Sequence, residues 1–191
     1  MSNCVRMTIA ELQEKLDPFV GKKITQPRTS NKGEVGILLE KLTGIPQSSA
    51  CLDCVDGELK VFPVKRTAKK LLVPKETIAV TMLNRDDLRA NTFNLSTAYT
   101  KLKRTLYVPY ERIGSEVIYM KPTLIDLQEN IELLTKLASD YDLIREKFSR
   151  GLPLSSRDGI LLQNRTKGRG HGSTSRAFYL RTGFAKSYIS F

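Results

Sequence analysis

The stretch CLDCVDGELKV, Cys51 to Val61, places two aspartates, a glutamate and a lysine within a few residues of one another. Asp56-Gly57 is the strongest two-residue signal for a type I′ turn, so the stretch predicts a β-hairpin. With that turn, Asp53 would face Lys60 across the two strands, and Glu58 would share their face because side chains alternate. The opposite face would carry the apolar residues Cys54, Leu59 and Val61.

Two carboxylates beside an ammonium group form a unit that suits phosphodiester hydrolysis. Carboxylate oxygens are ligands that Mg²⁺ prefers, and the bound ion acts as a Lewis acid and lowers the pKa of water. A lysine at that place can position the attacking water and offset the charge on phosphorus. The pattern alone is weak evidence, because many solvated hairpins carry such charges and a cross-strand pair contributes only ~0.2–1 kcal/mol.

The two cysteines of the same stretch do not predict a zinc site. Four ligands are needed, and the remaining candidates, Cys4 and His171, are far away in the sequence. We therefore expect Cys51 and Cys54 to pack as small apolar residues.

The charge of the chain points to a nucleic acid. Its 191 residues include 31 basic and 20 acidic ones, which give a formal net charge of +11. Such a balance in a domain of this size favours a DNA or RNA partner over a generally basic protein. No apolar run approaches the ~20 residues of a membrane helix, and the N-terminus has no signal-peptide pattern. Three cysteines give no disulfide framework, so we expect a cytoplasmic protein.

The periodicity of apolar residues predicts a mixed α/β protein around one small sheet. Helices are expected from Thr8, with Glu11 in a capping box and Pro18 at the end, and from Asn31 to Gly44. Strands are expected at 58–64, 77–83, 105–110 and 115–121, followed by a long helix over 123–151. The remainder reads as a strand, a glycine-rich basic loop and a second strand, with a short amphipathic end. We expect one domain with an N-lobe over about 1–95 and a C-lobe over about 96–191.

Four blocks of the sequence, in order, resemble the MutH and Sau-type GATC endonuclease family. The blocks are KGEVGILLE (32–40) with Asp53 and GELKVFP (57–63), KLKRTLYVP (101–109), LLQNRTKG (161–168) and SRAFYLRTGFAKSYI (175–189). The resemblance implies a restriction-endonuclease-like α/β fold of the PD-(D/E)xK class, with a mixed central sheet flanked by helices. It also implies metal-dependent cleavage of duplex DNA.

The resemblance implies a role for each matching residue. Glu40, Asp53 and Glu58 would be the catalytic metal ligands, Lys60 the catalytic lysine, and Lys103 a second lysine near the cleaved phosphate. Because the spacing from Asp53 to Glu58 is shorter than in the MutH pattern, Asp56 is the rival ligand. Residues expected to contact DNA are Lys32, Arg165, Lys167, Arg169, Arg176 and Tyr179. Tyr179 resembles the tyrosine that senses adenine methylation in the repair members of the family.

The sequence therefore predicts a Mg²⁺-dependent, sequence-specific endonuclease for double-stranded DNA, with GATC sites implied by the resemblance and Mn²⁺ as a substitute ion. Its basic C-terminal strands and loop are expected to line one wall of a DNA cleft, and His171 to contact DNA or solvent. The role is either that of a mismatch-repair nickase with protein partners or that of a restriction enzyme. The alternative is a non-catalytic DNA-binding module of the same fold. We expect a nucleoid-associated monomer or a weak dimer on DNA.

Overall fold

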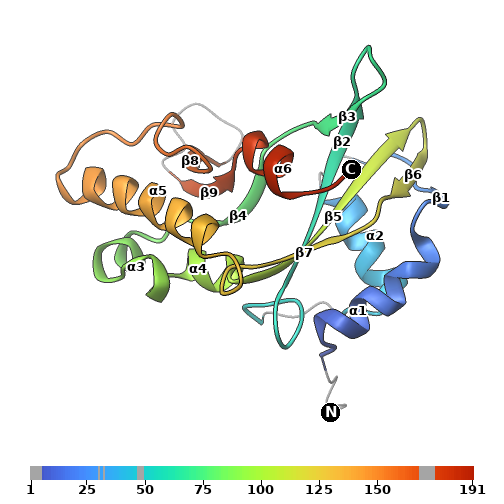
Figure 1. Cartoon of the computed structure of the whole chain (residues 1–191), viewed down its shortest axis with the longest axis horizontal. Coiled ribbons are helices and arrows are strands. Elements are labelled where there is room, and N and C mark those ends of the chain that lie inside the picture. Colours follow the sequence, from blue (N-terminus) through green and yellow to red (C-terminus); the bar gives the residue numbers. More distant parts are fainter. Residues whose placement is uncertain (1–5, 30, 32, 47–49, 168–174) are drawn as a thin grey trace. The chain divides into compact units, whose positions relative to one another are not determined.

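The first helix begins at the predicted capping box. In the computed structural model, α1 (Ile9–Leu16) has Thr8 as its N-cap, whose hydroxyl accepts from the Glu11 N–H. The Glu11 carboxylate in turn accepts from the Thr8 N–H at 2.7 Å. The helix ends before Pro18, where the short 3₁₀ helix η1 (Asp17–Phe19) follows. These local signals place α1 as the sequence predicts (Figure 1).

The second helix, α2 (Glu34–Thr43), ends where the sequence predicts and begins slightly later. Gly44 terminates it with φ of 76°, a left-handed conformation that glycine adopts without strain. The N-cap is Gly33 rather than Asn31, and the Asn31 side chain instead accepts from the Gly33 N–H at 2.9 Å.

The structure describes residues 6–29, 31, 33–46, 50–167 and 175–191. The chain divides into two compact units. Unit 1 comprises Met1–Glu76, Arg104–Ile125 and Ile189–Phe191, and unit 2 comprises Thr77–Lys103 and Asp126–Tyr188. No helix among the described residues is long and apolar enough to cross a membrane.

The sheet of unit 1 is mixed. Its strands are β1 (Lys23–Thr25), β2 (Glu58–Arg66), β3 (Leu72–Pro74), β5 (Arg104–Ile113), β6 (Glu116–Tyr119) and β7 (Thr123–Asp126). Their order is β1-β6-β5-β2-β3, and β7 also pairs with β5. β2 and β5 run parallel at the centre, and β1–β6, β5–β6 and β2–β3 are antiparallel. The predicted mixed central sheet with flanking helices is confirmed.

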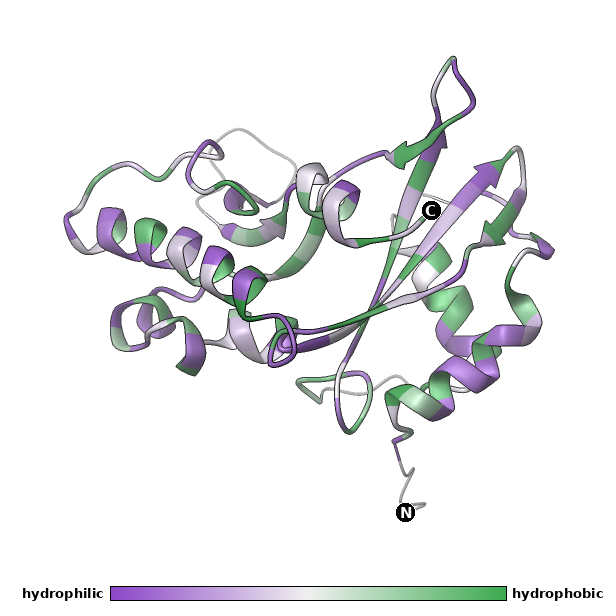
Figure 2. Cartoon of the chain, in the orientation of Figure 1, coloured by the Kyte–Doolittle hydropathy of each residue, from purple (hydrophilic) through white to green (hydrophobic). Residues whose placement is uncertain are grey.

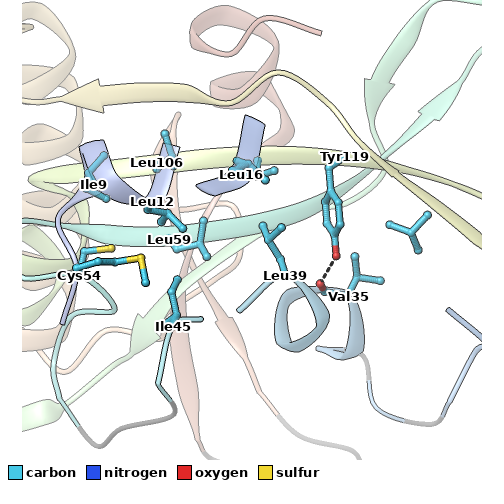
Figure 3. Close-up of a cluster of buried hydrophobic side chains, with 13 residues drawn as sticks. Ile9, Leu12, Leu16, Val35, Leu39, Ile45, Cys54, Leu59, Leu106 and Tyr119 are labelled. Atoms are coloured by element: carbon cyan, nitrogen blue, oxygen red, sulfur yellow. Dashed lines mark hydrogen bonds between the residues drawn. The ribbon is translucent and has the colours of Figure 1, made fainter. Parts of the chain in front are cut away.

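The core of unit 1 lies between this sheet and the first two helices. Leu12 and Leu16 of α1 and Leu39 of α2 are completely buried against sheet residues such as Leu106. Figure 3 shows these side chains together with the Tyr119 hydroxyl, which donates to the Val35 carbonyl at 2.8 Å. In Figure 2 the ribbons of α1 and α2 alternate between green, hydrophobic and purple, hydrophilic segments, as amphipathic helices do. The core thus fixes β2, the strand that carries the predicted catalytic residues.

Unit 2 contains a second sheet that the sequence analysis did not predict. It has three strands, in the order β4-β9-β8, all antiparallel. The strands are β4 (Ile78–Met82), β8 (Leu162–Thr166) and β9 (Arg176–Leu180). The helical elements are α3 (Arg85–Ala90), η2 (Phe93–Leu95), α4 (Thr97–Leu102), α5 (Ile131–Ser149) and α6 (Thr182–Tyr188). The Tyr141 ring packs against the rings of Phe93 and Phe178, with a centroid distance of 5.5 Å to each.

The predicted long helix over 123–151 is wrong in its first part. Thr123–Asp126 forms β7, and α5 begins only at Ile131, where the Asn130 side chain accepts from the Leu133 N–H. Leu124 and Leu127 continue the apolar spacing of α5 by coincidence. Pairing of β7 with β5 decides the conformation, because tertiary contacts outweigh local propensity.

Candidate active site

Strand β2 carries the glutamate and the lysine of the predicted active site. Glu58 opens the strand and is almost fully buried, with 2% of its surface exposed. Lys60 follows two residues later, on the same face because side chains alternate. Its ammonium nitrogen lies 2.6 Å from Glu58 Oε1, and 22% of its side chain is exposed. The pairing with β5 holds both residues in place, with Glu58 opposite Thr105 and Lys60 opposite Tyr107.

The predicted hairpin before Glu58 is wrong in two respects. Residues 51–56 form bends and no strand, and Gly57 has no positive φ, which a type I′ turn would require. The chain instead reverses one residue earlier, with the Cys54 N–H donating to the Gly57 carbonyl at 2.9 Å. Asp53 is therefore not a cross-strand partner of Lys60. Its Oδ2 accepts from the Leu59 N–H at 3.0 Å, which ties this loop to the start of β2.

Gly57 is needed for close packing rather than for a turn. A Cβ atom there would lie 2.6 Å from the Arg104 carbonyl oxygen and 3.0 Å from the Ile9 side chain. The first contact is shorter than real Cβ atoms show and the second is tight, so glycine lets the loop approach the Arg104 backbone this closely.

Asp56 holds the N-terminus of α1. Its Oδ1 accepts from the Ile9 N–H at 2.8 Å, and its Oδ2 lies 3.5 Å from Arg104 Nε. A carboxylate at this end of a helix satisfies a free N–H and interacts favourably with the helix dipole. Asp56 thus has a structural task, which favours Asp53 as the ligand of the two aspartates.

Glu40 extends from α2 into the same charged cluster. Burial raises its pKa, and the negative charge of Asp53 raises it further. Lys60 lowers the pKa of Glu40, and Glu58 raises it, with the net shift upward. Its carboxylate accepts no hydrogen bond from the part of the chain that the structure describes. The four side chains predicted to form the site are therefore close enough to affect one another electrostatically.

The chemical groups of the cluster suit a hard cation. It offers carboxylate oxygens, the ligand type of Mg²⁺ and Mn²⁺. Burial is the main cause of the raised pKa of Glu40, and the charges of Asp53 and Glu58 add to it, so a divalent cation would stabilise the ionised carboxylate. As the described side chains stand, no three acidic, histidine or cysteine groups are close enough together to hold a metal ion.

The two cysteines differ from each other. Cys54 is completely buried and belongs to the core of unit 1, so its predicted packing role is confirmed. Burial raises the pKa of its thiol to about 12, which keeps it protonated. Cys51 is exposed, so the packing role predicted for it is wrong.

The remaining predicted residues belong to unit 2 or fall outside the described residues. Lys103 is an exposed residue of unit 2 and the C-cap of α4, directly before β5. Lys32, Arg169 and His171 lie outside the described residues. The roles predicted for these four residues stay predictions.

Three of the basic residues predicted to contact DNA, Arg165, Lys167 and Arg176, lie in β8 or β9 or directly after β8. Arg165 is exposed, donates to Thr77 Oγ1 at 3.0 Å and lies over the Tyr179 ring at 5.6 Å. Lys167 is exposed just after β8. Arg176 donates through Nε to Asn164 Oδ1, so its guanidinium group is held against β8.

Two further arginines at this place, Arg157 and Arg181, were not predicted from the sequence. Arg157 and Arg181 line a hollow of about 410 Å³ together with Arg165. Arg181 lies two residues after Tyr179, and strand alternation could have suggested that they share a face. The loop position of Arg157 gives no such signal.

One known protein family matches a segment that includes most of the candidate site residues. The family described as DNA mismatch repair enzyme MutH matches residues 47–132. The predicted MutH-like resemblance is confirmed. The MutH-like segment contains Asp53, Glu58, Lys60 and Lys103, and Glu40 precedes it. Together with the mixed central sheet, the match also agrees with the predicted restriction-endonuclease-like fold class.

Similarity to curated proteins and to solved structures adds two findings. No curated protein matches the chain. Among solved structures, a complex of the restriction endonuclease MvaI with its cognate DNA substrate aligns at 12% sequence identity and a TM-score of 0.45. That alignment covers 94% of this chain and 93% of the MvaI chain.

Proposed function

We propose that the protein is a Mg²⁺-dependent endonuclease that cuts double-stranded DNA. The observation that carries the proposal is the cluster of Glu40, Asp53, Glu58 and Lys60 in unit 1. Three of these residues lie in the MutH-like segment, and that family resemblance supports a DNA endonuclease. Sequence specificity for GATC rests on the resemblance of the quoted motifs.

Glu40, Asp53 and Glu58 would hold the metal ion, for which their carboxylates must come closer together than they lie in this structure. Bound there, the ion supplies Lewis acidity to a phosphate oxygen and lowers the pKa of water. The supporting contacts come from the chain itself. Asp53 is oriented by the Leu59 N–H, and Glu58 is fixed by its place in β2.

Lys60 would orient the attacking water and offset the charge that develops on phosphorus. Its ammonium group is already held at 2.6 Å from Glu58 Oε1, so it needs little ordering before the reaction. An ammonium group offers three donors, of which one can remain on Glu58 while the others serve water or phosphate.

The basic residues of β8 and β9 would contact the DNA. Arg165 and Lys167 are exposed on β8 or next to it, and arginine is the commonest reader of guanine in the major groove. Tyr179 of β9 would contribute to the discrimination of methylated adenine, as the resemblance implies.

A plasmid-nicking assay tests the proposal. Supercoiled DNA with unmethylated, hemimethylated or fully methylated GATC sites is incubated with the protein and Mg²⁺ or Mn²⁺. We expect cleavage that EDTA abolishes. Lys60→Ala should remove cleavage and leave DNA binding largely intact. Lys23→Ala, which also removes a lysine paired with a glutamate in unit 1, serves as the control and should cut normally.

The outcomes separate the alternatives. Tight, salt-sensitive binding without cleavage in either metal would favour the non-catalytic DNA-binding module. Cleavage of both strands of unmethylated DNA by the protein alone would favour a restriction enzyme. Weak nicking of unmethylated or hemimethylated DNA would favour a repair nickase that acts with partner proteins. Normal cleavage by Lys60→Ala would show that the proposed site is wrong.

A further inference from the structure

The hollow of about 410 Å³ in unit 2 is lined by three arginines, and none of the described residues that line it is acidic. Its lining consists of Thr77, Ser156, Arg157, Ile160, Gln163, Arg165, Arg181, Thr182 and Gly183. All of these residues belong to unit 2. Three guanidinium groups around one space repel one another, and each can donate hydrogen bonds but accept none. A bound anion would offset this repulsion and accept the hydrogen bonds that the guanidinium groups can donate.

Two of the three arginines are held in place by neutral oxygens. Arg165 donates to Thr77 Oγ1 at 3.0 Å, and Arg181 Nη2 donates to the Ser156 carbonyl at 2.6 Å. Neither contact neutralises a guanidinium charge. The contacts orient the side chains at the hollow and leave further N–H donors on each group.

The guanidinium groups of Arg157 and Arg181 are not fully paired within the described part of the chain. The Arg157 guanidinium has neither an acidic partner nor a hydrogen bond within the described part of the chain. Arg181 Nε is buried without a hydrogen-bond partner among the described residues. A buried donor left unpaired costs ~1–3 kcal/mol, and a bound acceptor at the hollow would remove that cost for Arg181 Nε.

We infer that this hollow, through Arg157, Arg165 and Arg181, binds a phosphodiester group of the DNA backbone. The inference rests on the proposed function and adds two residues to its DNA-contacting surface. Guanidinium groups match phosphate oxygens with paired, charge-assisted hydrogen bonds. The volume exceeds that of one phosphate and leaves room for the adjoining sugar. A free phosphate ion or nucleotide shares this chemistry, and the test separates it from DNA.

The test compares the salt dependence of DNA binding. Fluorescence anisotropy of a labelled duplex is measured in EDTA, which prevents cleavage, over a series of KCl concentrations. Loss of one phosphate contact should reduce the slope of log K against log salt by ~0.9. We expect that reduction in the double variant Arg157→Gln, Arg181→Gln. The control is Arg150→Gln, which removes one exposed charge of unit 2 that does not line the hollow and should leave the slope unchanged.

Single variants keep the test valid if the double variant does not fold. Arg157→Gln breaks no side-chain hydrogen bond or ion pair among the described residues, so its melting temperature should stay close to that of the parent, and it should still bind DNA with a shallower slope. A parent that binds and cuts DNA, with unchanged slopes in Arg157→Gln and the double variant, would overturn the inference and leave the proposed function standing. A parent that binds no duplex DNA would overturn both.

A second arm addresses the free anion. The melting temperature of the parent is compared in phosphate and chloride at equal ionic strength. Stabilisation by phosphate that disappears in Arg157→Gln, combined with unchanged DNA slopes, would identify a site for a free anion and would refute the DNA contact. A shallower slope in the variants supports the inference whatever the effect of free phosphate.

Discussion

Asp53 and Asp56 should respond in opposite ways to substitution, and the difference identifies the metal ligand. Asp56→Ala removes the hydrogen bond to the Ile9 N–H and the half-exposed pair with Arg104. The first contact resembles a helix cap, with a loss of ~1 kcal/mol, and the exposed pair adds ~0–1 kcal/mol. In a chain of this length, each kcal/mol lowers the melting temperature by about 2–4 °C. Asp56→Ala should therefore melt several degrees below the parent and still cut DNA.

Asp53→Asn should instead lose activity while it remains folded. The asparagine oxygen can still accept from the Leu59 N–H, so the loop keeps its hydrogen bond at 3.0 Å. The negative charge at the metal site is lost. Because Lewis-acid stabilisation of the transition state is worth several kcal/mol, cleavage should fall by about two orders of magnitude or more. Raising the Mg²⁺ concentration should restore part of the rate.

The assay pairs thermal unfolding, followed by circular dichroism, with plasmid nicking at a temperature where both variants are folded. The rate of Asp56→Ala should stay within about threefold of the parent, which corresponds to less than ~0.7 kcal/mol in the barrier. If Asp56→Ala lost cleavage at an unchanged melting temperature and Asp53→Asn cut normally, the assignment of the two aspartates would be reversed.

Three further substitutions test the packing around the site and in unit 2. Gly57→Ala would place a Cβ atom 2.6 Å from the Arg104 carbonyl, and it should cost ~1–3 kcal/mol in denaturant unfolding; an unchanged midpoint would contradict the close approach. The carboxylate of Asp140 is buried and accepts three backbone N–H bonds of 2.6–2.8 Å from residues 160–162. Asp140→Asn has one acceptor oxygen and should lose ~2–5 kcal/mol, with urea midpoints as the measure. Burial tends to raise the pKa of Asp158, but the bonds from Lys147 and the Ser155 N–H outweigh burial and hold that pKa below its usual range. Its stabilisation is therefore present above about pH 3.9, the usual aspartate pKa, and is lost as the pH falls through the lowered folded value. Asp158→Asn should be less stable than the parent at pH 7, with the difference shrinking in acid; a constant difference would contradict the shift.

The sequence predicts those features of the fold that short segments determine. The capping box of Thr8 and Glu11 and the terminating Gly44 are local, and both appear where expected. Burial of α1 and α2 against the sheet follows from their apolar stripes. Such signals need no knowledge of distant residues.

Two of the wrong predictions, the hairpin and the long helix, share a different cause, because in each a distant strand decides the structure. The stretch 51–57 was expected to pair with β2, but β2 lies between β5 and β3, and Gly57 packs on Arg104. Likewise, β7 interrupts the apparent long helix because it pairs with β5. The charged residues of the site could be found from their types and order, but which aspartate is occupied elsewhere required the contact of Asp56 with α1.

The arginines of the hollow in unit 2 could not be grouped from the sequence either, because distant segments bring them together. Arg157 lies in a loop and Arg181 directly follows β9, and their sequence neighbours suggest no common role. Only the pairing of β8 with β9 and the loop before β8 bring them to one space with Arg165.

The parallel pairing of β2 with β5 also affects how the protein is made. The chain leaves unit 1 after Glu76 and returns at Arg104, so part of unit 2 is synthesised between the two central strands. At ~5–20 residues per second, Glu58 and Lys60 emerge from the ribosome several seconds before the strand that must hold them. During that interval β2 lacks the parallel strand that pairs with its backbone, and its apolar face depends on other elements for cover. We therefore expect early folding of this protein to depend on α1 and α2, which are already complete and can cover that face while translation continues.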